Sequence, residues 1–85
     1  MSDYIIEYRG ISTASSGAIV GASVNPSGTS PVKMILNWKG AKMLLASYDA
    51  NGWFNFSPGS PLHCPADAEI TVEGAGTGAI AWRSV

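Results

Sequence analysis

Cysteine, charge and long apolar runs are all scarce in this sequence, and each shortage narrows what the protein can be. A single cysteine, Cys64, excludes a disulfide within the chain and fits synthesis in a reducing compartment. Charged residues make up only 13% of the chain, and the formal net charge is −1. No overall field therefore attracts nucleic acid or an anionic membrane, and neither is expected as a partner.

No apolar run approaches the ~20 residues that a bilayer-crossing helix needs. The opening Met-Ser-Asp-Tyr has neither the basic nor the apolar region of a secretory signal. We therefore expect a protein that is made in the cytoplasm and that leaves it only as part of something larger.

The 85 residues form a single domain, 1–85, near the lower limit of what folds without disulfides or metal. Small side chains dominate Ala18 to Val24 and Ala75 to Ala81, and the surface carries little charge. Contacts between subunits supply the apolar burial that a short chain lacks. This composition favours a symmetric homo-oligomer or a component of a protein lattice.

The chain is organised around a hairpin between Val32 and Tyr48. Two runs of alternating apolar and polar residues flank Gly40-Ala41, and a glycine in the first turn position predicts a type II′ turn. That turn places Lys39 opposite Lys42. One face of the predicted hairpin is apolar and belongs to the core, namely Val32, Met34, Leu36, Trp38, Met43 and Leu45. The other face is mixed and includes Tyr48.

Short alternating segments separated by Gly, Pro, Asn and Asp recur through the rest of the chain, and none has a helical apolar stripe. We predict an all-β fold, a small antiparallel β-sandwich that is jelly-roll-like and has about eight short strands. Residues 1–9 form an edge strand or an arm. In Ala18 to Val24, Val20 and Val24 share one side and Ile19 the other. Gly74 to Gly78 is read as a hairpin loop.

Candidate sites for chemistry are weak. His63 and Cys64 are neighbours on a short strand, so they point to opposite faces and do not form a dyad. One histidine and one cysteine cannot supply a zinc site. Asp49 to Gly52 matches the start of a calcium loop but lacks the distal glutamate, and it also suits a tight turn. The loop from Gly74 has no following helix to hold phosphate. We therefore expect no catalytic, cofactor-binding or metal-binding residues, and no enzyme activity.

Two surfaces are candidates for binding a protein partner. Lys33, Lys39 and Lys42 hold three of the five basic residues on one face of the hairpin. Their acidic counterpart is Glu69 or Glu73 of the same chain, a neighbouring subunit or a larger partner; solvated lysines that protect a hairpin end are an equal alternative. The other candidate is the N-terminal strand, with contacts from Tyr4, Ile5 and Glu7, because an edge strand can extend a neighbour's sheet.

Trp38, Trp53, Trp82 and Tyr48 raise the alternative of a sugar-binding platform. The alternation assigns Trp38 and Trp82 to the core. Trp53 follows a turn and is the aromatic residue with a claim to exposure, so a glycan-binding adhesin or receptor-binding module would use Trp53.

The C-terminal part from Gly52 to Val85 resembles small β-sandwich structural proteins of tailed bacteriophages. The similar segments are Gly52 to Phe56, Pro58 to Leu62, Asp67 to Val72 and the glycine-rich stretch Gly74 to Trp82. The resemblance implies a capsid decoration, neck or fibre-base protein, usually a trimer or another symmetric ring, that binds the major capsid protein or another virion protein. The implied location is the virion, after synthesis in the host cytoplasm.

Overall fold

The fold is an all-β sandwich of two antiparallel sheets. The computed structural model describes residues 3–14, 17–56, 59–65 and 67–84. Its strands in chain order are β1 (Asp3–Tyr8), β2 (Ile11–Thr13), β3 (Gly17–Pro26), β4 (Val32–Trp38), β5 (Ala41–Asp49), β6 (Gly52–Asn55), β7 (Leu62–Cys64), β8 (Glu69–Gly74) and β9 (Gly76–Arg83). The described residues form no helix of the length and apolarity that a bilayer crossing needs.

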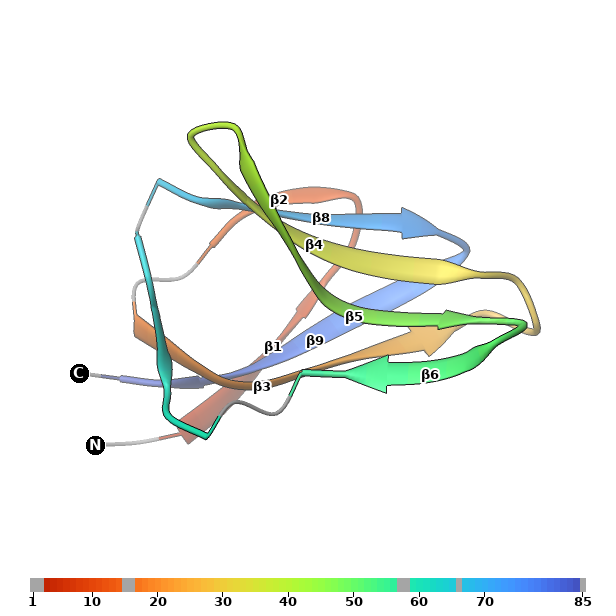
Figure 1. Ribbon diagram of the computed structural model, residues 1–85, viewed down its shortest axis with the longest axis horizontal. Coiled ribbons are helices and arrows are strands. Elements are labelled where there is room, and N and C mark those ends of the chain that lie inside the picture. The colour runs from red at the N-terminus through yellow and green to blue at the C-terminus, as the bar shows by residue number, and fades with distance from the viewer. Residues whose placement is uncertain (1–2, 15–16, 57–58, 66, 85) are drawn as a thin grey trace.

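The strand order confirms the jelly-roll prediction. One sheet has the order β1-β9-β3-β7 and the other β2-β8-β4-β5-β6, and the two lie as separate layers (Figure 1). The first strand pairs with the last, β1 with β9. Inside that pair in the sequence, β2 pairs with β8, β3 with β7 and β4 with β5, so the pairs are nested around the central hairpin. This nesting is the rolled ribbon of a jelly roll, with β6 added at one edge. The extra strand over the expected eight is β2, a three-residue strand that pairs with β8.

The central hairpin forms, but its turn lies one residue earlier than predicted, which moves the pairing next to the turn by two residues. Trp38 pairs with Ala41, so the two turn residues are Lys39 and Gly40, with φ of 50° and 84°. Positive φ at both positions is the signature of a type I′ turn, which also suits the twist of a hairpin. Lys42 therefore lies opposite Asn37 and not opposite Lys39.

A β-bulge in β5 changes which hairpin residues reach the core. The register shifts between Met34 and Ile35, and Leu45 is the extra residue on β5. Leu45 and Ala46 are both buried as a result. Beyond the bulge the alternation is reset, so Tyr48 lies opposite Val32 and packs against the core, contrary to its predicted place on the mixed face.

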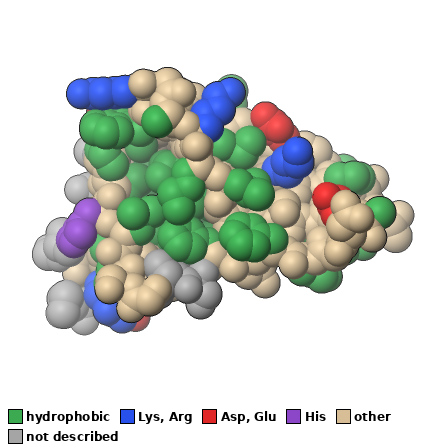
Figure 2. Space-filling model, viewed as in Figure 1, with side chains coloured by type: hydrophobic (Ala, Val, Ile, Leu, Met, Phe, Trp, Pro, Cys, Tyr) green, Lys and Arg blue, Asp and Glu red, His purple; other side chains and the backbone are tan. Residues whose placement is uncertain are grey.

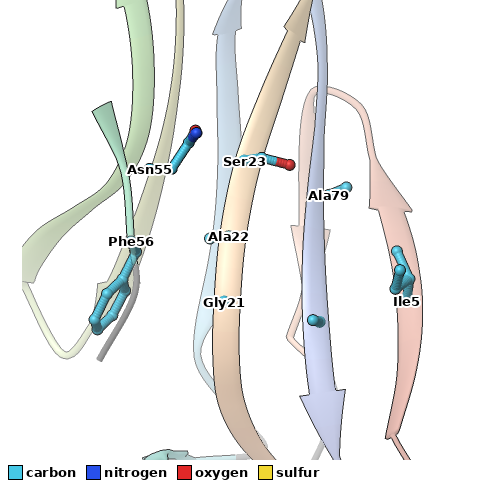
Figure 3. A pocket seen from close by; sticks show the side chains of 8 residues that line it. Ile5, Gly21, Ala22, Ser23, Asn55, Phe56 and Ala79 are labelled. Carbon is cyan, nitrogen blue, oxygen red and sulfur yellow. The ribbon is translucent and has the colours of Figure 1, made fainter. Parts of the chain in front are cut away.

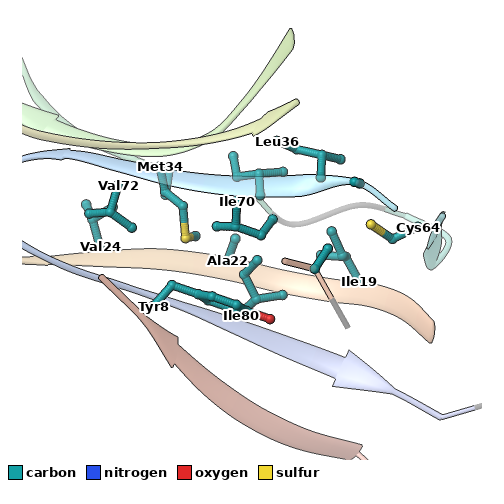
Figure 4. Close-up of a cluster of buried hydrophobic side chains, with 14 of the residues drawn as sticks. Tyr8, Ile19, Ala22, Val24, Met34, Leu36, Cys64, Ile70, Val72 and Ile80 are labelled. Atoms are coloured by element: carbon teal, nitrogen blue, oxygen red, sulfur yellow. The ribbon is translucent and has the colours of Figure 1, made fainter. Parts of the chain in front are cut away.

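The core fills the space between the two layers (Figure 4). Trp82 is fully buried, as predicted, and its indole Nε1 donates a 2.9 Å hydrogen bond to the Tyr8 hydroxyl. Trp38 and Met43 were expected in this core, but each is 39% exposed. Both lie on the core-facing side of the hairpin, near its tip, where the sheet extends past the opposite layer.

The structure decides three further expectations, which concern β1, β3 and the segment that leads into β9 of the four-stranded sheet. Residues 3–8 form an edge strand paired with β9, and not a free arm. A bulge between Ile19 and Gly21 puts Ile19 and Val24 on the same, buried side of β3, which the simple alternation missed. Gly74 to Gly78 is not a hairpin loop, because β8 and β9 belong to different sheets and the chain crosses between the layers there.

Candidate interaction surfaces

A shallow hollow lies on the outer face of the four-stranded sheet, with a volume of about 270 Å³ (Figure 3). Its floor consists of small residues from the two central strands, Gly21 and Ser23 on β3 and Ala79 and Ala81 on β9. These residues share a face because Gly21 pairs with Ala81 and Ser23 with Ala79. Ile5 and Phe56 stand on either side as walls. We refer to these six residues as the hollow.

Neither the backbone conformation nor close packing within the chain requires a glycine at position 21. Its φ is not in the positive range, and a Cβ there would approach only the Phe56 carbonyl oxygen, at 3.8 Å. A Cβ at this position therefore meets no obstacle within the chain. The missing side chain keeps the floor of the hollow open.

The predicted contact residues of β1 divide between its two faces. Ile5 and Glu7 point outward, and Ile5 is 74% exposed beside the hollow. Tyr4 points inward, lies opposite Trp82 and packs against the core. Glu7 forms a 3.3 Å ion pair with the exposed Arg9, and Asp3 forms a 3.0 Å ion pair with Arg83. The Arg83 guanidinium lowers the pKa of the Asp3 carboxyl.

A second concave surface, the tip groove, lies between the tip of the central hairpin and β7. It has a volume of about 260 Å³, and its apolar lining includes Leu36, Trp38, Met43 and Leu62. Figure 2 shows hydrophobic side chains gathered between blue, positively charged side chains at the upper edge and the purple histidine at the left edge. Trp38 is held by a 2.9 Å hydrogen bond from its Nε1 to Asp67 Oδ1.

The structure separates the three lysines that were expected to act together. Lys39 is in the turn, and its Nζ lies 4.9 Å from the centroid of the Trp38 ring. Lys33 and Lys42 are on the strands and point outward from the five-stranded sheet. Lys33 lies opposite Glu73, and Lys42 lies opposite Asn37, which in turn faces Glu69. The acidic residues proposed as counterparts within the chain are thus on the same face.

Trp53, the candidate for glycan contact, is 57% exposed. It lies opposite Tyr48, and the centroids of the two rings are 4.5 Å apart with planes inclined by 45°. One face of the indole is therefore covered by tyrosine, while much of the ring is open to solvent.

His63 and Cys64 have the arrangement that the sequence predicts, with His63 exposed and Cys64 buried. Burial and the nearby carboxylate of Asp67 raise the pKa of the Cys64 thiol, so the site favours the unreactive protonated form. The Asp49 carboxylate accepts a 2.7 Å hydrogen bond from the Asn51 backbone N–H, which makes this segment an Asx turn. Among the described residues, no group of three or more His, Cys, Asp or Glu side chains is placed to hold a metal.

The sequence contained part of the signal for the hollow. The small residues of β3 and β9 were recognised as favouring a contact, but their common face depends on pairing between segments far apart in the chain. Asn55 and Phe56, which complete one side, gave no signal, because their position depends on an isolated bridge between Phe56 and Ala22.

No protein-family model, no curated protein and no solved structure matches this chain.

Proposed function

We propose that this chain is a non-enzymatic structural protein of a virion, a capsid decoration or neck component. It attaches to the major capsid protein or another virion protein, and it does so as a symmetric homo-oligomer. The trimer expected from the resemblance is the favoured stoichiometry of that assembly. The protein is made in the host cytoplasm and ends in the virion.

The hollow is the observation that carries the proposal. It is open and shallow, its floor consists of small uncharged residues, and the exposed Ile5 stands at its rim. A small molecule would be poorly enclosed there, since ligand sites usually bury most of the ligand's surface. An open, shallow apolar surface with an aliphatic anchor suits another protein surface. We therefore assign attachment to the hollow, with the Lys39 and Lys42 hairpin tip as the second candidate contact.

The jelly-roll topology supports the proposal only by analogy. The same architecture serves in viral capsid proteins and in lectins, and a fold alone does not determine a function.

Attachment can be tested with particles produced by the genome that encodes the chain. We expect mass spectrometry of purified particles to find the protein in a fixed number of copies. Ala79→Glu places a charge on the floor of the hollow and should remove the chain from the particles. Ala50→Glu, the same change in an exposed turn, is the matched control and should leave attachment intact.

The hairpin tip is separable in the same experiment. If Lys39→Glu with Lys42→Glu removes the chain from particles and Ala79→Glu does not, attachment belongs to the tip. Particles that never contain the wild-type chain would refute the virion proposal.

The alternative function is glycan binding by an adhesin or receptor-binding module. The open face of Trp53 favours it, because aromatic faces commonly stack on sugar rings. Binding on a glycan array that is lost in Trp53→Ala, together with absence from particles, would establish this alternative and overturn the structural proposal.

A further inference from the structure

The outer face of the five-stranded sheet carries a row of three apolar residues and one threonine, here called the apolar row. Ile70 and Val72 of β8 are buried, so the residues that alternate with them point outward. Residues directly opposite one another on antiparallel strands share a face, so the registers extend each outward residue into a row. One row crosses β2, β8, β4 and β5 as Ile11, Thr71, Ile35 and Leu44. Ile11 is 72% exposed and Leu44 is 43% exposed.

Charged residues flank this row, and their sign depends on the strand. β8 contributes Glu69 and Glu73, whereas β4 and β5 contribute Lys33 and Lys42. None of these four side chains forms an ion pair within 4.0 Å in the part of the chain that the structure describes. Asn37 lies between Glu69 and Lys42, and its Oδ1 is shielded from solvent without a hydrogen-bond partner among the described residues.

We propose that this face binds the same face of a second copy of the chain, around a two-fold axis parallel to the strands and between β8 and β4. That rotation sets β8 over β4 of the second copy and β2 over its β5. Ile11 then lies over Leu44 of the second copy, and Thr71 lies over its Ile35. The apolar rows of the two copies cover one another at the spacing of about 10 Å that packed sheets adopt.

Charge complementarity identifies the second copy as the occupant. The same rotation places Glu73 over Lys33 of the second copy, and Lys33 over its Glu73. Because Lys33 and Glu73 are also neighbours within each chain, the four charges form a ring of alternating sign around the axis. A partner of one charge sign would meet repulsion from half of this face, whereas a rotated copy meets attraction at both Glu73–Lys33 contacts and sets Glu69 and Lys42 over the uncharged Asn37 and Thr13.

This contact goes beyond attachment to a particle and is independent of the hollow, which lies on the other sheet. A two-fold contact pairs copies, so it predicts an even number of subunits. If other surfaces form a trimer, two trimers joined through this face make a hexamer with D3 symmetry.

The test uses the full-length protein in sedimentation and native mass spectrometry. The wild type should form dimers or larger even-numbered species. Lys33→Glu and Glu73→Lys should each weaken pairing by roughly tenfold or more, because like charges then meet across the axis. An equimolar mixture of the two variants should recover pairing. Dimers that contain one copy of each variant should outnumber dimers that contain two copies of the same variant.

Lys42→Glu is the matched control. It reverses a charge on the same face, but Lys42 lies over Thr13 of the second copy, so pairing should change by less than about threefold. Leu44→Glu should abolish pairing while the far-UV spectrum stays that of the wild type. A wild type that is monomeric or odd-numbered at all concentrations, or a mixture without enrichment of mixed species, overturns the inference. Neither result bears on the hollow, whose own test is the loss of particle attachment in Ala79→Glu.

Discussion

The indole N–H of Trp82 depends on a single hydroxyl group. It is fully buried and donates to Tyr8, a residue from the opposite end of the chain. Tyr8→Phe leaves this donor without the acceptor, which should lower the free energy of unfolding by about 1–3 kcal/mol. Asp67→Ala removes the acceptor of the exposed Trp38 indole and should cost less than about 1 kcal/mol, because water can replace it. Urea unfolding measures the loss of stability in both variants. Equal losses would contradict the conclusion that the buried Trp82 N–H relies on the Tyr8 hydroxyl.

Cys64 gives the stability a dependence on pH. Its folded-state pKa is raised above the ordinary thiol value of about 8.5, chiefly by burial and also by Asp67. The folded chain thus keeps a proton that the unfolded chain releases. This contribution to stability is fully present below the unfolded pKa and is lost as the pH rises through the folded pKa.

The pH effect is measured against Cys64→Ala. The wild type should lose more stability than the variant as the pH increases from about 7 to about 10, because only the wild type carries this group. Urea midpoints at each pH give the comparison. A difference between the two proteins that stays constant over this range would show that Cys64 does not contribute.

Two glycines illustrate opposite reasons for lacking a side chain. A Cβ on Gly74 would collide with the Pro31 carbonyl oxygen, and its φ is 99°. Gly74→Ala should therefore destabilise the fold by more than about 2 kcal/mol. Gly21→Ala meets no such obstacle and should leave stability unchanged or raise it by up to about 1 kcal/mol. Thermal unfolding of the two variants tests the contrast, and a strongly destabilised Gly21→Ala would mean that the fold itself needs this glycine.

Among the elements, strands were easier to predict than register. Alternation located the strand segments of β4, β8 and β9, because each buries one face. It also located β5, although the bulge there buries the adjacent residues Leu45 and Ala46. The turn was displaced by one residue, since Gly40 suits either position and Lys39 adopts a positive φ that its residue type disfavours. The bulges in β3 and β5 gave no local signal, because an inserted residue is defined only against its partner strand.

The turn of the central hairpin supplies a prediction for the same element. Gly40 has a φ of 84°, a conformation that costs an alanine about 1–2 kcal/mol. Gly40→Ala should lower the free energy of unfolding by about that amount. Gly59→Ala is the control, because Gly59 has open space around it and no positive φ, so its effect should stay within about 0.5 kcal/mol. Equal effects in chemical denaturation would contradict the type I′ turn.

For the molecule as a whole, the N-terminal strand is part of the sandwich. β1 pairs with β9 along its length, and Tyr4, Ile6 and Tyr8 cover buried residues such as Trp82 and Ile80. Deleting residues 1–8 should therefore abolish cooperative unfolding and expose apolar surface, which dye binding and calorimetry detect. Ile5→Glu changes only the outward face and should retain a cooperative transition. A truncated chain that still unfolds cooperatively would restore the idea of a free arm.

At this scale the sequence also shows its limit for the candidate surfaces. The lysines and the exposed Ile5 could be identified locally, but the hollow needs β3 beside β9 and the outer apolar row needs four strands in register. Ile11 and Leu44 are 33 positions apart and share a surface only through β8 and β4. Such surfaces depend on which strands lie side by side, and the local pattern of apolar and polar residues does not determine that order.

The nested pairing of strands has a consequence for the order in which the chain folds. The central hairpin closes a loop of two residues, whereas β1 and β9 bring together Asp3 and Arg83. Closing a long loop costs more conformational entropy, so each inner pair lowers the cost of the next one out. Folding should begin in the middle of the sequence and proceed outward, with both ends of the chain docking last. β9 pairs with both β1 and β3, so neither contact can form until β9 has left the ribosome, and the sandwich stays incomplete while the earlier strands emerge.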